Sequence, residues 1–397
     1  KFMARRILYL SYFYSPDLGA GSFRNTALSQ ALSKKLNSDD LVDIMTTLPN
    51  RYNMENLSAE EFEQIDQIRI HRWKVPKHGN GFIRQIISFL AYRKQVLNKI
   101  GDQKYDLVFA SSSKLFTAYL AYCIAKKRGL KLYVDLRDLF SENLVELIKF
   151  PALGRVASFF VRHYFERPVM NFATHINVNS EGFLNSVTTS SSAHVSFFPN
   201  GIDDFFLGHL QDPHLANKPR IICYAGNIGE GQGLEKIIPM LANKLGSNFL
   251  FKVIGEGSTK HKLQEEVTRL GLLNVEILPP VPRYELLQYY CHAHYLFVHL
   301  NDFKSFRKVL PSKLFEYACF NIPIVAGVSG YAKDFIEEHI KDNVFVFDPC
   351  DVNSAAEYFL NSDYYLLARP NFVDRFKRTH ISENMADSII QYLPPMA

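Results

Sequence analysis

The sequence predicts an α/β protein made of two doubly wound, Rossmann-like domains, each with a mostly parallel sheet. Three observations lead to this fold class. Short runs of Ile, Val, Leu and Tyr alternate with segments of helical period, as in βαβ units. This alternation occurs twice, with a polar, proline-containing stretch between the two halves. A chain of 397 residues is also long for a single hydrophobic core, so two domains of ordinary size are expected.

The first half opens on a buried strand predicted at Ile7–Phe13, followed by a helix at Ser22–Lys35. Apolar residues recur in that helix with the period of an α-helix and would share one buried face. Those residues are Phe23, Ala27, Leu28, Ala31 and Leu32. Further strands are predicted at Leu41–Thr46, Ile68–Val75, Asp106–Ser111, Lys131–Leu136 and His175–Asn179.

The border between the halves is predicted near the stretch Gln211–Pro219, which precedes a strand at Arg220–Ala225. Later strands are predicted at Phe249–Ile254, Val275–Leu278, Tyr295–Leu300, Pro323–Ala326 and Val344–Phe347. We expect a first domain over 1–205, a second over 206–381, and a terminal helix over 382–397 that packs back on the first. Doubly wound domains bind ligands at the carboxyl ends of their strands, so a cleft between two facing domains would hold the ligands.

Composition excludes several classes of protein. Hydrophobic residues make up 47% and charged residues 21%, which argues against disordered and fibrous chains. The net charge of +5 comes without an arginine-rich arm or RNA-binding signature, so no nucleic-acid partner is expected. Five cysteines without a CxxC pair fit a reducing compartment, and no run approaches the roughly 18 apolar residues of a membrane span. These features predict a cytoplasmic protein.

The strongest local motif is Pro311–Tyr317, which is typical of a helix start. Proline suits the first helical positions, and the backbone N–H groups of Ser312 and Lys313 could hold a phosphate, to which the lysine adds positive charge. Glu316, one turn further on, could accept hydrogen bonds from ribose hydroxyls. The alternative is an ordinary capped surface helix with a Lys–Glu pair.

Glycine-rich turns follow three predicted strands. The longest, Gly226–Gly233, leads into a helix, and its glycines would let the backbone approach a diphosphate. The others are Gly255–Gly257 and the loop Ser15–Ser22, with Arg24 one turn beyond it. None has the GxGxxG spacing of a dinucleotide site, which makes a nicotinamide dehydrogenase the least favoured class. The alternative for each turn is a tight βα connection that needs glycine for its geometry.

Taken in order, these segments resemble the family-4 glycosyltransferases, which have the two-domain GT-B fold. The resemblance also includes Asp135–Leu139 and Phe198–Asp203, and it covers nearly the whole chain. It is greatest for the bacterial branch that builds O-antigen and capsule chains, which includes proteins assigned as L-fucosamine transferases.

The resemblance implies retaining transfer of a sugar from a nucleoside diphosphate sugar, with UDP favoured over GDP, without a cofactor and without a bound metal. The chain contains no Asp-x-Asp pair of the kind that holds a divalent ion. Arg137 and Asp138 would lie at the catalytic centre, and Asp17 and Arg24 would contact the acceptor. The donor would be bound by Gly19, Gly21, Gly226, Asn227, Gly229, Gln232, Gly233, Gly255, Gly257, Val281, Ser312, Lys313, Leu314 and Glu316.

Four positions depart from the family pattern. Lys308 stands where a glutamate usually contacts the donor sugar, which leaves the sugar open. Gln232 replaces a lysine, so Lys313 would be the main cation at the diphosphate, and Pro280 replaces a glycine. Arg137 falls near the position of the family's histidine. The alternative for Asp135, Arg137 and Asp138 is a buried structural Arg–Asp pairing.

The family acts on saccharide acceptors, here expected to be linked to a polyprenyl diphosphate. A basic helix over 82–100, preceded by the basic segment His71–His78, is compatible with contact to the cytoplasmic face of the inner membrane. The alternative is a helix that covers the sheet of the first domain. Two rival functions are a nucleotide-sugar 2-epimerase on the same fold and a non-catalytic GT-B subunit that binds a partner transferase.

Overall fold

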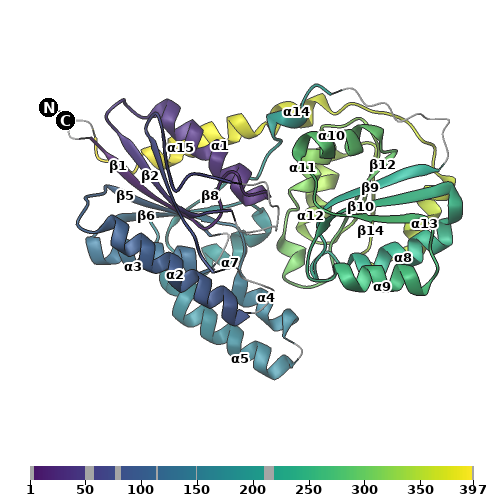
Figure 1. The fold of residues 1–397 in the computed structure, drawn as a ribbon, viewed down its shortest axis with the longest axis horizontal. Helices are drawn as coiled ribbons and strands as arrows, with labels where there is room; N and C mark the ends of the chain where they lie inside the picture. The colour runs from purple at the N-terminus through teal and green to yellow at the C-terminus, as the bar shows by residue number, and fades with distance from the viewer. Residues whose placement is uncertain are drawn as a thin grey trace. The chain divides into compact units, whose positions relative to one another are not determined.

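The computed structural model describes residues 4–49, 58–76, 82–112, 115–148, 150–209 and 219–395. The chain forms two compact units (Figure 1). Unit 1 comprises Lys1–Asn200 and Arg378–Ala397, and unit 2 comprises Gly201–Lys377. The borders expected from the sequence were at 205 and 381; most of the polar stretch 211–219 lies outside the described residues.

Unit 1 is built on an eight-stranded sheet with the order β3-β4-β2-β1-β5-β6-β7-β8. All neighbouring strands are parallel except β3 and β4. The central strand β1 is buried from Ile7 onward, as expected for a strand with helices on both faces of its sheet. The strands are β1 (Arg6–Ser11), β2 (Leu41–Thr47), β3 (Phe62–Ile65), β4 (Ile68–Trp73), β5 (Leu107–Ser111), β6 (Lys131–Leu136), β7 (His175–Val178) and β8 (His194–Phe197).

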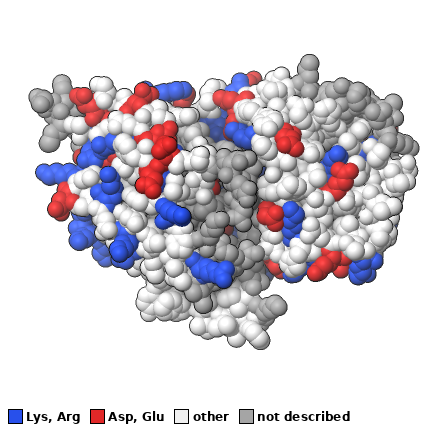
Figure 2. All heavy atoms as spheres, in the orientation of Figure 1, with Lys and Arg blue, Asp and Glu red and all other residues white. Residues whose placement is uncertain are grey.

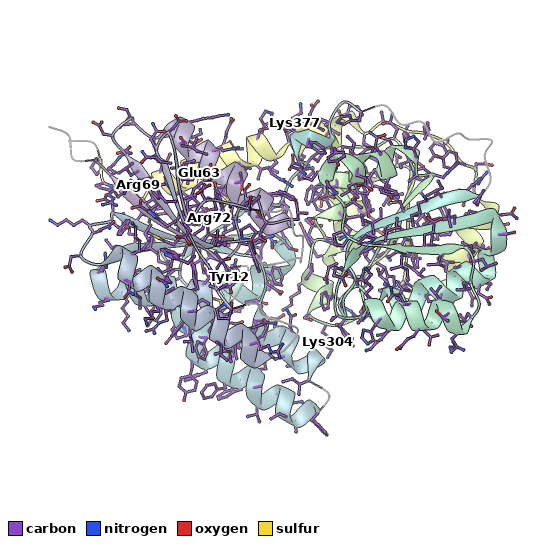
Figure 3. All side chains as sticks on the ribbon, viewed as in Figure 1. Tyr12, Glu63, Arg69, Arg72, Lys304 and Lys377 are labelled. Carbon is purple, nitrogen blue, oxygen red and sulfur yellow. The ribbon has the colours of Figure 1, made fainter. Side chains whose placement is uncertain are left out.

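Two edge strands of unit 1, β3 and β8, were not predicted. Strand β3 is short and mostly exposed, so it lacks the apolar alternation that marks a half-buried strand. It is held by antiparallel pairing with β4 and by an ion pair of 2.9 Å between Glu63 on β3 and Arg72 on β4 (Figure 3). The edge is therefore fixed by cross-strand partners that the local sequence does not reveal.

The helices of unit 1 cover both faces of its sheet (Figure 1). The α-helices are α1 (Ala20–Lys35), α2 (Phe82–Ile100), α3 (Leu115–Arg128), α4 (Phe140–Leu147), α5 (Pro151–Val161), α6 (Arg167–Phe172), α7 (Leu184–Thr188) and α15 (Arg378–Ile390). A π-helical turn, η1 (Arg162–Glu166), joins α5 to α6, and a 3-10 turn, η2 (Glu181–Phe183), precedes α7. Among the described helices, none has the length and apolar character needed to cross a membrane.

The last helix, α15, follows unit 2 in the chain but packs on helix α1 of unit 1. Its buried residues Met385 and Ile389 belong to the same hydrophobic cluster as Leu28 and Leu32 of α1 and Tyr9 of β1. The core of unit 1 is thus completed by the C-terminal segment.

Unit 2 contains a six-stranded sheet, all parallel, with the order β11-β10-β9-β12-β13-β14. Its strands are β9 (Arg220–Asn227), β10 (Phe249–Glu256), β11 (Val275–Leu278), β12 (Tyr295–His299), β13 (Ile324–Gly327) and β14 (Val344–Phe347). Every strand predicted from the sequence is present in the two sheets, and no strand end differs from the prediction by more than two residues. The prediction of two parallel α/β domains is confirmed.

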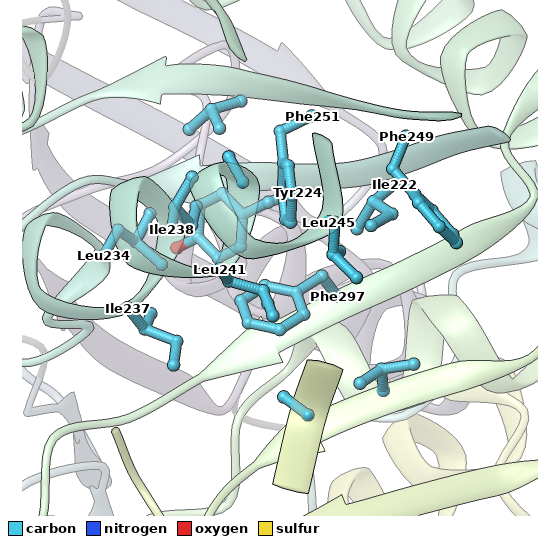
Figure 4. Packing of buried hydrophobic residues seen from close by; sticks show 14 of the residues in the cluster. Ile222, Tyr224, Leu234, Ile237, Ile238, Leu241, Leu245, Phe249, Phe251 and Phe297 are labelled. Carbon is cyan, nitrogen blue, oxygen red and sulfur yellow. The ribbon is translucent and has the colours of Figure 1, made fainter. Parts of the chain in front are cut away.

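The core of unit 2 lies between this sheet and helix α8 (Leu234–Leu245) (Figure 4). Leu234, Ile238 and Leu241 of α8 recur at helical spacing and pack towards Phe251 and Phe297 of the sheet. The remaining α-helices are α9 (Lys260–Arg269), α10 (Arg283–His292), α11 (Lys313–Ala318), α12 (Tyr331–Phe335), α13 (Val352–Asn361) and α14 (Pro370–Arg375). Short turns are η3 (Asp204–Phe206), η4 (Gly246–Asn248), η5 (Phe306–Lys308) and the π-helical η6 (Ile336–Ile340).

Candidate functional site

The carboxyl ends of β9 and β10 meet at two glycines. Gly226 and Gly255 are opposite each other in the parallel register, with φ of 148° and 153°. A side chain on Gly255 would collide with the carbonyl oxygen of Gly226. Likewise, a side chain on Gly257 would collide with the backbone of Ile228. Only glycine fits these positions, and the predicted glycines of the two turns are brought together at one edge of the unit 2 sheet.

The turn Gly226–Gly233 is closed by one of its own predicted site residues. Gln232 Oε1 accepts hydrogen bonds from Asn227 Nδ2 at 2.7 Å and from the Gly229 N–H at 3.3 Å. Gly233, with φ of 59°, then leads into α8. The Gln232 amide oxygen therefore shapes the turn, and the expected contact of Gln232 with the donor stays a prediction.

Two further residues, one at the end of β12 and one two positions beyond it, hold this turn in place, and neither was selected from the sequence. His299 Nδ1 lies 2.6 Å from the Gln232 carbonyl oxygen, and its Nε2 lies 2.9 Å from the Cys350 N–H. Because an amide N–H can only donate, Nε2 accepts and Nδ1 carries the proton. The Asn301 N–H donates to the Gly231 carbonyl oxygen at 2.8 Å. Both residues act through the backbone of the turn, so a sequence motif could not identify them.

Burial lowers the pKa of His299 from 6.5 to about 4. A pKa below its unfolded value means that the neutral ring stabilises the fold above pH 6.5 and that this stabilisation is lost as the pH falls from 6.5 towards 4. Protonation would also place a hydrogen on Nε2, opposite the Cys350 N–H. We expect the free energy of unfolding to fall by up to about 3 kcal/mol from this residue over that interval.

Urea unfolding at pH 7 and pH ~4.5 tests this pH dependence in the wild type and in His299→Asn. The control is His261→Asn, which changes an exposed histidine on α9. His299→Asn should lose less stability on acidification than the wild type, and His261→Asn should behave as the wild type. Equal losses in all three proteins would contradict the role of His299.

Lys313 lies at the same edge of the sheet. Its ammonium occupies the space that a side chain at Gly226 would fill, and Nζ lies 5.1 Å from the centre of the Tyr224 ring. Helix α11 begins at Lys313, with Ser312 as its N-cap residue. Pro311 therefore precedes the helix, although it was expected at one of the first helical positions. The predicted cation is thus beside the predicted glycine turn.

The other predicted donor-binding residues near α11 differ in their burial and in their hydrogen-bond partners. The Leu314 side chain is fully buried and its N–H donates to the Pro311 carbonyl oxygen, so it packs in the core. Glu316 Oε2 lies 3.4 Å from the hydroxyl of the buried Tyr290 of α10. Val281 follows β11 and is partly buried.

Lys308, at the position expected to read the donor sugar, lies in η5. Phe306 of the same turn fills the space in which a side chain at Gly231 would lie. Lys308 is therefore two residues from a direct contact with the glycine turn. Among the described residues, His, Cys, Asp and Glu side chains form no group of three or more that could hold a metal ion.

In unit 1 the structure brings Gly21 and Arg137 together. A side chain at Gly21 would overlap the Arg137 guanidinium. Asp138, next to Arg137, accepts a hydrogen bond of 3.0 Å from Asn143 Nδ2 and lines a small cavity of about 30 Å³ that also contacts Glu166. Gly19 is the N-cap residue of α1.

Arg24 and Asp17, the two predicted acceptor contacts, are both buried. Arg24 Nε and Nη2 donate to the Asp135 carboxylate at 2.8 and 3.0 Å, and its Nη1 donates to the Pro199 carbonyl oxygen. Burial alone would lower the pKa of Arg24, but the negative charge of Asp135 outweighs it and the net shift is upward. Arg24 and Asp135 thus form a buried ion pair in this structure, and the expected contact of Arg24 with an acceptor stays a prediction.

The two parallel α/β units have the GT-B fold of known glycosyltransferases, as comparison with solved structures shows. Sucrose-phosphate synthase from Thermosynechococcus elongatus matches with a TM-score of 0.75 and 14% identity over 98% of each chain. HepE of Anabaena, solved with UDP and glucose, matches with a TM-score of 0.65 and 15% identity over 98% of this chain and 100% of that one. The lipopolysaccharide outer core galactosyltransferase WaaB matches with a TM-score of 0.61 and 13% identity over 98% of this chain and 100% of that one.

Residues 209–362, which form most of unit 2, match the family described as glycosyl transferases group 1. The chain is therefore similar to that family over unit 2. It is also 27% identical, over 189 residues, to a protein of Escherichia coli (strain K12) named as the colanic acid biosynthesis glycosyl transferase WcaI. That match spans 44% of this chain and 46% of the relative, which is less than half of either.

Proposed function

We propose that this protein is a glycosyltransferase that moves a sugar from a nucleoside diphosphate sugar to a saccharide acceptor in the synthesis of a bacterial surface polysaccharide. The observation that carries the proposal is the position of the Lys313 ammonium against the backbone of Gly226. An ammonium beside a glycine turn at the carboxyl end of parallel strands is suited to a diphosphate. The domain match and the similarity to WcaI support the class of reaction.

The proposed roles follow from this placement. The backbone at Gly226, Gly229 and Gly233 admits the diphosphate. The Lys313 ammonium neutralises its charge as the sugar leaves, and the backbone N–H of Ser312 donates a hydrogen bond to it. Glu316 accepts hydrogen bonds from the ribose. From unit 1, Gly19, Gly21, Arg137 and Asp138 remain part of the proposal on the basis of the family resemblance.

The proposed transfer retains the configuration of the sugar and needs no metal. The bond between the anomeric carbon and the diphosphate oxygen breaks, and the acceptor oxygen forms its new bond on the same face of the sugar. The acceptor proton passes to the leaving diphosphate, so no strong general base is required. We favour UDP over GDP as the nucleotide, no cofactor, and an acceptor linked to a polyprenyl diphosphate at the cytoplasmic face of the inner membrane.

The test is to incubate the protein with a panel of UDP and GDP sugars and a lipid-linked acceptor, with and without EDTA. We expect one UDP sugar to bind, to be consumed only with acceptor, and to give a product of unchanged anomeric configuration by NMR whether or not EDTA is present. Change of the sugar at C2 without acceptor would instead identify a 2-epimerase. Failure to bind any nucleoside diphosphate would favour a non-catalytic subunit and overturn the proposal.

A further inference from the structure

Helix α5 exposes large apolar side chains along most of its length. Phe159 is 69% exposed and Val156 is 66% exposed, and more than half of the surface of Leu153 and Phe160 is also accessible. Soluble proteins seldom expose contiguous apolar patches of this kind, and those that occur commonly mark a binding surface. We call these four side chains the α5 apolar face.

The geometry of α5 explains why this face is turned outward. The opposite side packs on α4 through Gly154, where a Cβ atom would lie 3.2 Å from the carbonyl oxygens of Leu144 and Val145. At about 100° per residue, Val156, Phe159 and Phe160 fall on the side of the helix away from Gly154. The close approach of α4 at Gly154 therefore fixes which side remains exposed.

Two arginines line one edge of the α5 apolar face. Arg155 and the first residue of η1, Arg162, are about two helical turns apart on the same side, and both are exposed. A helix with an aromatic face bordered by arginines suits the boundary between lipid head groups and acyl chains. Its aromatic rings can enter the apolar layer while the guanidinium groups meet phosphates.

Most neighbouring helices of unit 1 are basic; the exception is α4, on which α5 packs and which contains Glu142 and Glu146. Segments α2, α3, α5, η1 and α6 contain a single acidic residue, Glu166, which is buried and accepts hydrogen bonds from Ser141. Their basic residues are Arg84, Arg93, Lys94, Lys99, Lys126, Lys127, Arg128, Arg155, Arg162 and Arg167. Figure 2 shows white surface with blue side chains over the lower part of unit 1, where α2 and α5 lie.

Helix α2, the basic helix selected from the sequence, belongs to the same layer. Its Phe89 ring lies 5.3 Å from Phe116 of α3, which lies 5.5 Å from Phe165 of η1. It also exposes Ile87 and Leu90. The structure thus adds α5 to a layer in which α2 had been the only candidate.

We propose that the α5 apolar face binds an anionic lipid bilayer, with α5 lying in the plane of the interface and Arg155 and Arg162 on lipid phosphates. Charge distinguishes this occupant from a second copy of the chain, because two copies of the same basic face would repel each other. The proposal does not require transferase activity, so it can fail while the proposed function stands.

The first test measures co-sedimentation of the full chain with vesicles of phosphatidylcholine, with and without phosphatidylglycerol. We expect binding to the anionic vesicles that weakens as salt is added. Phe159→Ser with Phe160→Ser should weaken that binding by about tenfold or more, since two rings are removed from the apolar layer. The matched control is Leu273→Ser, which alters a side chain of unit 2 that is 98% exposed and should bind as the wild type.

The contribution of charge is tested with Arg155→Gln and Arg162→Gln together, with Lys262→Gln on α9 as the control. The arginine pair should lower the affinity for anionic vesicles by several-fold at low salt, and Lys262→Gln should not. All of these positions are exposed, so circular dichroism should show unchanged folding.

Insertion can be observed directly because the chain has one tryptophan, Trp73. In a Trp73→Phe background, Phe159→Trp should show a blue-shifted emission with anionic vesicles, and Leu273→Trp should show none. The proposal is overturned if the wild type does not bind these vesicles, or if the Phe159 and Phe160 variants bind equally well. It is also overturned if those variants convert a wild-type dimer to a monomer, which would identify a second copy as the occupant.

Discussion

Replacing Lys313 with alanine is expected to lower kcat/KM with the nucleotide sugar by at least about a hundredfold. The ammonium lies where a side chain at Gly226 would be, next to the backbone proposed to receive the diphosphate. In the proposed metal-independent transfer, removal of this charge leaves the negative charge of the departing diphosphate largely unneutralised. The rate of nucleoside diphosphate release measures the effect.

Lys313→Arg should restore little of this activity. In the wild type the ammonium already fills the space beside Gly226, and the planar guanidinium is larger than the ammonium. Lys262→Ala, on the exposed surface of α9, is the control and should leave kcat/KM unchanged. A Lys313→Ala protein that folds and turns over at the wild-type rate would remove Lys313 from the donor site.

Replacing Asp135 with alanine should destabilise unit 1 by about 3–5 kcal/mol, since it leaves the buried Arg24 without its counter-charge. Trp73 on β4 is the only tryptophan, so its fluorescence during urea unfolding reports on unit 1. Arg24→Met combined with Asp135→Leu should regain part of the loss, because a buried pair replaced by apolar residues no longer leaves an isolated charge.

Glu266→Ala is the matched control, since it removes one partner of the exposed pair with Arg269 on α9 and should have little effect on stability. The alternative assignment of Arg24 makes the opposite prediction. If Arg24 contacted an acceptor, Arg24→Met would raise the KM for that acceptor with stability unchanged, and that result would refute a structural role for Arg24.

The fold was largely predictable from the sequence because buried parallel strands are short apolar runs that glycine, proline or polar residues interrupt. The edge strands β3 and β8 were not, since their pairing depends on neighbours far along the chain. The proximity of Gly226, Gly255 and Lys313 was expected from the rule that ligand sites lie at the carboxyl ends of strands.

Other features of the candidate site lie beyond local sequence. The Gln232 side-chain amide closes the turn because it accepts a hydrogen bond from the Asn227 side chain. His299 holds the same turn through the backbone carbonyl oxygen of Gln232. Arg24 was selected as an acceptor contact, and its partner Asp135 is more than a hundred positions away in the sequence. Such pairings are decided by packing, and motif spacing has no information about them.

The packing of α15 on α1 has a consequence for the order in which the protein can mature on the ribosome. Domains usually fold as they emerge, the N-terminal one first. In this chain the side of α1 that carries Leu28 and Leu32 is covered by Met385 and Ile389, which are translated only after the whole of unit 2. The core of unit 1 therefore cannot be completed until α15 has been translated. Unit 2 is the first part of the chain whose residues are all available for folding.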